Sequence, residues 1–279
     1  MKRTLKKYQC LGALAWAVCL GSLNAVAGFA FANDSAGLGS FVSPHFHPIA
    51  NRGDHVFVAN TPNNTLDVIH AKSLEKVTEI SVGIDPVSVA IRPDGLEIWV
   101  SNHISDSISV IDNDPNSLTH WNVVATIQAF DDKLATSFDE PVGIAFASND
   151  KAYVALSSEN QIAVIDVRTR KIRRRLRIPA QDPRGIVVSN GRLFVIPFES
   201  NNQTQLSGGR RDQIDGNLVT FDAWEHSINH NNVLSLGHVV DIIKHPDVPD
   251  RDLFVFDTTT DRLVTAVDTL GTLLYGLTT

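Results

Sequence analysis

The sequence predicts an all-β protein in which a unit of short strands is repeated along the chain, and two observations lead to that prediction. The first is the pattern within one unit. Residues 87–91 alternate between apolar and small or polar side chains, which is the period of a strand with one buried face. Pro93-Asp94-Gly95 then supplies a turn, and residues 98–100 and 108–111 are β-rich runs of strand length.

The second observation is that this unit recurs. The run after the turn has copies at residues 56–60, 98–102, 152–156, 193–197 and 253–257. A second run follows each copy, at residues 66–69, 108–111, 162–165, 218–221 and 263–266. Three units close with a third run, at residues 77–82, 123–127 and 172–178. A period of about 40 residues with four short strands per unit is typical of β-propeller blades. A β-sandwich is the alternative, but a sandwich need not repeat its sequence.

These motifs resemble the YVTN-type β-propeller repeat family. Residues 85–90 with Pro93-Asp94-Gly95 are similar to its inner-strand motif, and residues 107–112 are similar to its third strand. Trp99-Val100-Ser101-Asn102 resembles the tetrapeptide that gives the family its name. The resemblance runs from about residue 44 to the C-terminus and implies a ring of four-stranded antiparallel blades. It implies little about activity, because propellers host many functions.

The residues before the repeats have the features of a targeting segment. Four basic residues lie within the first seven, an apolar run follows at residues 11–20, and small residues offer cleavage sites after Ala27 or Ala32. We therefore expect a signal peptide at residues 1–27, with a cut after residue 32 as the alternative, and a periplasmic or secreted protein. An uncleaved membrane anchor is another reading, but the apolar run is short for a span.

The rest of the chain is expected to contain a flexible lead-in at residues 28–42 and the propeller repeats at residues 43–279. The repeats are expected at about 43–82, 84–130, 139–179, 182–237 and 238–279. Rings of this type usually have about seven blades. The five units are therefore expected to form an incomplete arc, with a five-bladed ring as the alternative. We expect residues 273–277 to stay exposed and the two ends to promote self-association.

Composition restricts the function classes. Apolar residues make up 43% of the chain and charged residues 20%, as in ordinary globular proteins. Both cysteines, Cys10 and Cys19, lie in the expected leader, so the repeats have no disulfide and no cysteine metal site. The chain has no C-x-x-C-H motif and cannot itself attach a c-type haem. Its net charge of -7 argues against nucleic acid as a partner.

Candidate ligand residues lie on the loops that enter the inner strands and on the loops after the second strands. These loops usually form one mouth of a propeller channel. The candidates here are Asp85, His103, Asp139, Glu140, Arg184, Glu199 and His238. Carboxylates and histidines could hold Ca²⁺ or another divalent cation, as the similarity to lactonase-like propellers implies. None of these residues has a local ligand spacing, so polar loop residues that meet solvent are the alternative.

Two histidines suggest a second, different metal site. His45 and His47 are two positions apart, so on a strand they would point to the same face. With a third histidine, such as His103, they could bind Zn²⁺ or Cu²⁺. The alternative is a pair of histidines that flank a turn around Phe46, with Pro48 ending the strand. No other cofactor is predicted.

A basic segment is expected on the outermost strand of the third unit. It contains Arg168, Arg170, Lys171, Arg173, Arg174, Arg175 and Arg177. The functional interpretation is a patch for an acidic partner, an envelope lipid or nucleic acid, of which nucleic acid is the least favoured because the protein is expected to be exported and is acidic. The structural alternative is that charge on an edge strand prevents sheets from pairing edge to edge.

Three functions remain open. The first is an exported, non-enzymatic β-propeller that binds a protein or small-molecule ligand at its face. This one is favoured, because no catalytic motif of the serine-hydrolase, zinc-protease, phosphate-binding or dinucleotide type occurs. The second is a cation-dependent, lactonase-like hydrolase. The third is an accessory propeller for a haem-containing electron-transfer protein, because the similar propellers include exported ones joined to haem-bearing domains.

Overall fold

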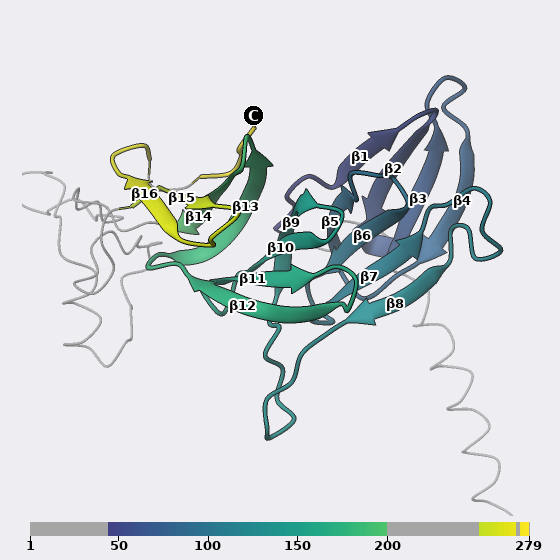
Figure 1. The fold of residues 1–279 in the computed structure, drawn as a ribbon. Coiled ribbons are helices and arrows are strands. Elements are labelled where there is room, and N and C mark those ends of the chain that lie inside the picture. The colour runs from purple at the N-terminus through teal and green to yellow at the C-terminus, as the bar shows by residue number, and fades with distance from the viewer. Residues whose placement is uncertain (1–43, 200–250, 272–273, 279) are drawn as a thin grey trace, which may run out of the picture. The chain divides into compact units, whose positions relative to one another are not determined.

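The computed structural model describes residues 44–199, 251–271 and 274–278 (Figure 1). These residues form sixteen strands in four antiparallel sheets of four strands each, with one short 3₁₀-helix at Thr61–Asn63. The all-β propeller architecture expected from the sequence is confirmed. The described residues belong to one compact unit. The expected signal peptide, the lead-in and His238 lie outside the described residues.

The four sheets are called blades one to four here. Blade one consists of β1 (Ile49–Arg52), β2 (His55–Asn60), β3 (Thr65–His70) and β4 (Lys76–Ser81). Blade two consists of β5 (Pro86–Ile91), β6 (Glu97–Asn102), β7 (Ser107–Asp112) and β8 (Val123–Ile127). Blade three consists of β9 (Pro141–Ser148), β10 (Lys151–Leu156), β11 (Gln161–Asp166) and β12 (Lys171–Arg177). Blade four consists of β13 (Gln181–Ser189), β14 (Arg192–Glu199), β15 (Leu253–Asp257) and β16 (Leu263–Val267).

The fourth blade differs from the expected division into repeats. Residues 253–257 were expected to be the second strand of a fifth unit, but β15 pairs with β14 as the third strand of blade four. The turn after β15 explains why it fits there. Asp257 accepts hydrogen bonds from the amides of Thr259 and Thr260, just as Asp166 at the end of β11 accepts one from Thr169. The third strands of blades three and four therefore share an Asp-capped turn. Residues 200–250 lie outside the described residues.

The blades pack face to face through a repeated aromatic position. Phe57, Trp99 and Tyr153 are the third residues of the second strands in blades one to three, and each is at most 1% exposed. Each one packs in the apolar cluster that its blade shares with the next blade. Phe194 has the same position in blade four and is only half-buried. Phe254, which was expected to match these residues, instead packs toward blade three, because it belongs to a third strand.

The chain before β1 runs along the inner edge of blade two. The amide of Phe46 donates to the carbonyl of Val87 at 3.1 Å, and the amide of Val89 donates to the carbonyl of His47 at 3.0 Å. Phe46 is 4% exposed and packs with Val87 and Val142. A Cβ on Gly185 would lie 2.9 Å from the Phe46 ring, so only glycine allows inner strand β13 to come this close.

The C-terminal residues form no strand over 274–278, although residues 273–277 were expected to be the final strand. Tyr275 is 73% exposed and meets the ring of Phe198 edge-on, with ring centroids 5.0 Å apart. Leu277 is half-buried against the Phe46 cluster. The expectation that this segment stays exposed therefore holds for Tyr275 and not for Leu277.

Candidate functional site

The mouth surface is formed by the segments that enter the inner strands and by the turns between second and third strands. We define it as residues 83–85, 103–106, 137–140, 157–160 and 180–182. An acidic residue followed by proline opens β5, β9 and β13: Asp85-Pro86, Glu140-Pro141 and Asp182-Pro183. The structure therefore brings most of the expected loop residues to one surface.

Each of these acidic residues is held by a side chain from the preceding blade. Asn64 accepts a hydrogen bond from the amide of Asp85 at 2.9 Å, Asp106 from Glu140 at 3.0 Å, and Asn160 from Asp182 at 2.8 Å. The three acceptors occupy one repeat position, since each is the residue directly before the third strand of its blade. The same link is therefore made at three successive blade junctions.

The backbone is strained at these acidic residues. Asp85, Glu140 and Asp182 have φ of 62°, 48° and 55°. A positive φ is unfavourable for any residue with a Cβ, and a following proline adds a steric restriction. Such strain persists only where surrounding contacts hold the backbone in place. The hydrogen bonds that these backbone amides donate to Asn64, Asp106 and Asn160 supply that restraint.

Carboxylates gather on the mouth surface where blade two meets blade three. The group comprises Asp106, Asp139, Glu140 and Glu159. Burial and the charges of Asp106 and Glu140 raise the pKa of Asp139 above its ordinary value. The amide of Asp139 donates to Glu159 at 3.1 Å, which holds the two loops together. A cationic group placed here would relieve the repulsion between these carboxylates.

His103 lies beside this group. Its Nε2 is 3.9 Å from a carboxylate oxygen of Glu140, and its buried Nδ1 has no hydrogen-bond partner among the described residues. The same Glu140 oxygen accepts hydrogen bonds from Ser157 at 3.4 Å and from Ser158. The side chain of Glu140 remains 46% exposed, so this oxygen can still be approached from solvent.

The other expected site residues have different surroundings. Asp85 is 6% exposed, and its carbonyl accepts the amide of His103 at 2.8 Å. Arg184 pairs with Asp182 and lies over the ring of Phe198, 3.9 Å from its centroid. The charge of Arg184 is therefore already paired with Asp182. Glu199 ends β14, next to the residues that are not described.

The strand predicted for His45 and His47 is wrong, because β1 begins at Ile49 and His47 has a φ of 52°. The expectation that both rings point to one face of a strand therefore does not apply. His45 Nε2 lies 2.7 Å from the hydroxyl of Thr61, and the His47 ring packs on Phe46 at 4.1 Å. Burial lowers the pKa of His47, and a hydrogen bond with the backbone of Leu277 opposes that shift. In the described part of the chain, no three His, Cys, Asp or Glu side chains lie together as metal ligands would.

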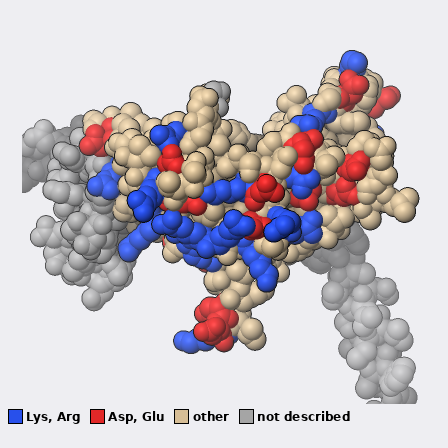
Figure 2. All heavy atoms as spheres, in the orientation of Figure 1, with Lys and Arg blue, Asp and Glu red and all other residues tan. Residues whose placement is uncertain are grey.

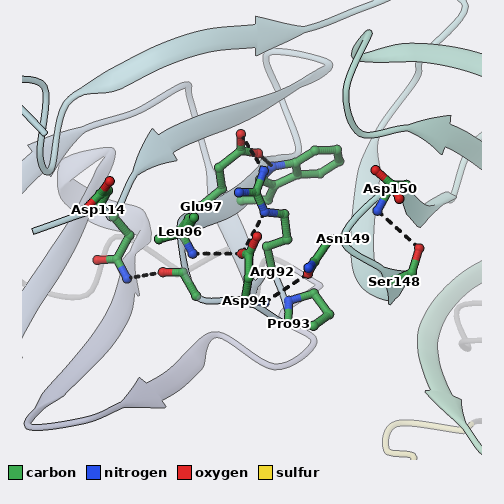
Figure 3. A network of polar contacts seen from close by, with 12 residues as sticks. Arg92, Pro93, Asp94, Leu96, Glu97, Asp114, Ser148, Asn149 and Asp150 are labelled. Carbon is green, nitrogen blue, oxygen red and sulfur yellow. Dashed lines mark hydrogen bonds and ion pairs between the residues drawn. The ribbon is translucent and has the colours of Figure 1, made fainter. Parts of the chain in front are cut away.

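The opposite surface of the propeller carries an ion network (Figure 3). The guanidinium of Arg92 contacts Asp94 at 2.8 Å and Glu97 at 2.9 Å. Glu97 also accepts from Trp99 Nε1 at 2.9 Å and pairs with Arg170 of blade three at 3.3 Å. All the charges in this network face an opposite charge, so it is internally neutralised.

Two cavities of about 310 Å³ flank this network, and both are lined by Arg92, Glu97 and Arg170. The network itself belongs to a pattern that recurs between blades. The first residue of each second strand contacts the turn that precedes the outer strand of the next blade. The pairs are His55 with Trp121, Glu97 with Arg170, and Lys151 with Asp261. Because this link occurs at all three junctions, we attribute the network to assembly of the propeller.

The basic segment lies on β12, as expected. Several of its arginines hold neighbouring elements: Arg170 pairs with Glu97, Arg173 with Asp166, and Arg175 with Glu159. Arg174 donates to the carbonyl of Thr260 in blade four at 3.4 Å.

Sequence reasoning missed the contribution of Asp106, Ser158 and Glu159 to the mouth surface. A signal was present for Asp106, because Asn64, Asp106 and Asn160 recur at one repeat position. No such signal existed for Ser158 or Glu159, whose contact with the next loop depends on how the blades are placed.

The described residues therefore define the chain as a β-propeller protein with a polar, acidic mouth. No protein-family model matches the sequence, so the YVTN-type assignment remains a resemblance. Among curated proteins, the chain is similar to Protein NirF of Stutzerimonas stutzeri, with 27% identity over 149 residues. That match covers 53% of this chain and 34% of NirF.

Two solved structures share the fold. Hydrazine synthase of Kuenenia stuttgartiensis matches with a TM-score of 0.53 and 19% identity, over 85% of this chain and 53% of that one. The WD40 β-propeller domain of Doa1 matches with a TM-score of 0.51 and 10% identity, over 82% of this chain and 55% of that domain's chain. The chain thus spans about a third of the curated relative and about half of these structures. At such identities the likeness shows the fold alone. No helix in the described residues is long and apolar enough to cross a membrane.

Proposed function

We propose that this chain is an exported, non-enzymatic β-propeller that binds a partner through the mouth surface, by a cationic group seated among Asp106, Asp139 and Glu140. The observation that carries the proposal is the crowding of carboxylates between blades two and three. Burial, together with repulsion from Asp106 and Glu140, already raises the pKa of Asp139. A cation would be attracted to this position and would favour the ionised carboxylate. The basic, apolar leader supports export.

An organic cation, such as a lysine or arginine side chain, suits this position better than a bound metal ion. Calcium takes six to eight oxygen ligands from a converging set. The described carboxylates do not converge in that way, since they form no metal-type group of three. The hydrolase alternative needs a divalent cation at the mouth, so it has less support than binding.

The test is a calorimetric titration of the purified chain with a peptide of alternating glycine and arginine, and separately with CaCl₂. We expect saturable peptide binding that is lost in Asp106→Asn/Asp139→Asn. Asp132→Asn is the matched control, because Asp132 is an exposed carboxylate of the same loop. Calcium binding without peptide binding would overturn the proposal. Chelator-sensitive hydrolysis of a lactone would favour the hydrolase instead.

An accessory role beside a haem-containing electron-transfer protein is the second candidate. Its support is the resemblance of the repeats to exported propellers joined to haem domains, together with the lack of any C-x-x-C-H motif in this chain. We expect a neighbouring gene to encode a C-x-x-C-H protein that co-purifies with the chain and gives a haem absorbance band. Co-purification that is unchanged in Asp106→Asn/Asp139→Asn would separate this role from the mouth surface.

A further inference from the structure

The outer strand of blade three is strongly cationic. Five of the seven residues of β12 are lysine or arginine, and Arg168 and Arg170 lie in the turn before it. Figure 2 shows lysine and arginine side chains gathered in a band over this part of the molecule. β12 is the last strand in the order β12-β11-β10-β9, so its outer edge pairs with no strand among the described residues.

Intramolecular contacts account for only part of this charge. Arg170, Arg173 and Arg175 are paired with carboxylates, and Arg174 is held by a backbone carbonyl. The remaining cations are exposed and make no ion pair or side-chain hydrogen bond within the described residues: Arg168, Lys171 and Arg177. These three charges contribute nothing visible to the fold.

Protection of sheet edges does not explain the charge either. β8 and β16 are also outermost strands, and their sequences, VVATI and LVTAV, contain no charged residue. They need protection more than β12 does, since Val124 is 39% exposed and Val264 is 52% exposed. The remaining outermost strand, β4, carries Lys76 and Glu79, which pair with each other. Since two outermost strands lack charge and β4 has one charge of each sign, edge protection does not account for the five cations of β12.

We propose that the outer edge of β12 binds an acidic, extended segment of a partner protein by strand addition. An edge strand presents backbone N–H and C=O groups at ladder spacing, and a polypeptide in extended form can pair with them. Alternate side chains of an added strand lie about 7 Å apart on one face. The β-bulge opposite Val164 and Ile165 places Lys171 and Arg177 on opposite faces of β12, because Lys171 is in register with Asp166 and Arg177 with Gln161. Glutamate or aspartate at alternate positions of an added strand can therefore approach one of these cations, and acidic side chains at the intervening positions can approach the other. A nucleic-acid backbone or a lipid surface also carries negative charge, but it has no backbone N–H and C=O groups that could pair with the edge of β12.

Three labelled peptides separate strand addition from simple attraction between charges. The first is (Glu-Val)₄, which has alternating charge and high strand propensity. The second is (Gln-Val)₄, which lacks the charge, and the third is (Glu-Pro)₄, which keeps the charge but lacks half of the backbone donors. We expect the purified chain to bind (Glu-Val)₄ at least about tenfold more tightly than the other two in fluorescence anisotropy at low salt, and binding should weaken as salt is added.

The variant that tests the surface is Arg168→Ala/Lys171→Ala/Arg177→Ala. These residues make no ion pair or side-chain hydrogen bond with other described residues, so the unfolding midpoint should not change. The affinity for (Glu-Val)₄ should fall about tenfold or more. Lys72→Ala is the matched control, an exposed cation on blade one that pairs with Asp54. Equal binding of (Glu-Pro)₄, or preferential binding of anionic vesicles or duplex DNA, would overturn strand addition. Undiminished affinity in the triple variant would show that these three residues do not form the binding surface. The peptide comparison and the triple variant both test β12 independently of the mouth surface.

Discussion

Replacing Trp99 tests how the blades are held together. Trp99 is fully buried between blades two and three, its ring meets Phe146 edge-on with centroids 5.0 Å apart, and its Nε1 donates to Glu97. Trp99→Ala removes a large side chain from a packed interface and should cost about 3–5 kcal/mol. A domain has about 5–15 kcal/mol of stability in total. The variant should therefore lose a large part of its stability.

A second variant separates packing from the hydrogen bond. Trp99→Phe keeps most of the apolar contact and removes the N–H, and a hydrogen bond to a charged group contributes about 1.5–3 kcal/mol. Glu97 keeps both Arg92 and Arg170 as partners. The loss should accordingly lie at the lower end of that range.

The assay is equilibrium denaturant unfolding followed by circular dichroism, since fluorescence would change with the tryptophan itself. Phe194→Ala is the matched control, because Phe194 has the same repeat position but is only half-buried. It should cost clearly less than Trp99→Ala. If Trp99→Ala shifted stability by less than about 1 kcal/mol, where the loss of a buried aromatic usually costs several, the assigned interface would be wrong. Equal losses for Trp99→Phe and Trp99→Ala would mean that the hydrogen bond, not packing, dominates.

Four further outcomes are expected. Asp261→Asn should lower the thermal midpoint, because it weakens the contacts of Asp261 with Lys151 and Tyr153. The double variant Lys151→Glu/Asp261→Arg should restore part of the loss, because it places the two charges as Glu97 and Arg170 have them. Asp139→Asn should stabilise the chain at neutral pH, because a raised carboxyl pKa makes folding less favourable as pH rises above the ordinary Asp value. This gain should vanish on acid titration, and a gain that persists in acid would contradict the assignment. Gly143→Ala should destabilise the fold in urea melts, since its Cβ would lie 2.3 Å from the carbonyl of Arg184. Intact-mass analysis of exported protein should show cleavage after Ala27 or Ala32, and retained Met1 would disprove it.

The strands could be located from sequence because each unit repeats the same physical pattern. Runs such as residues 98–102 are β-rich, and a Pro-Asp-Gly turn sets where the hairpin reverses. The structure places these runs in β2, β6, β10 and β14. Local pattern and global packing agree in blades one to three, so a local signal was sufficient there.

The order of strands in blade four could not be found in this way. A second strand and a third strand are both short apolar runs buried on two faces, so residues 253–257 fit either position by period alone. The distinguishing feature is the turn that follows. Asp257 caps the amides of Thr259 and Thr260, which is the chemistry of the turn after a third strand. Turn residues therefore carry information that the strand itself lacks.

The candidate site was predicted only in its general location. His103 and Glu140 were both placed on mouth loops, but they are 37 positions apart in sequence and belong to different blades. Their contact depends on how blade three is rotated against blade two, which no local pattern encodes. The strand predicted at His45 and His47 is wrong for a related reason. A proline follows His47 and the φ of His47 is positive, so the chain bends at residues 46–47 and β1 begins only at Ile49.

The contacts between blades also specify which blades are neighbours. Each junction uses the same two positions, but the chemistry changes from His55 on Trp121, to Glu97 on Arg170, to Lys151 on Asp261. If blade four followed blade two directly, Glu97 would face Asp261, and two carboxylates would repel each other. If a second copy of blade three followed blade three, Lys151 would face Arg170. Specific assembly requires that wrong pairings be unfavourable as well as that right ones be favourable. Opposite signs of charge at the Glu97 and Lys151 positions achieve both at the junctions of blades two and three and of blades three and four.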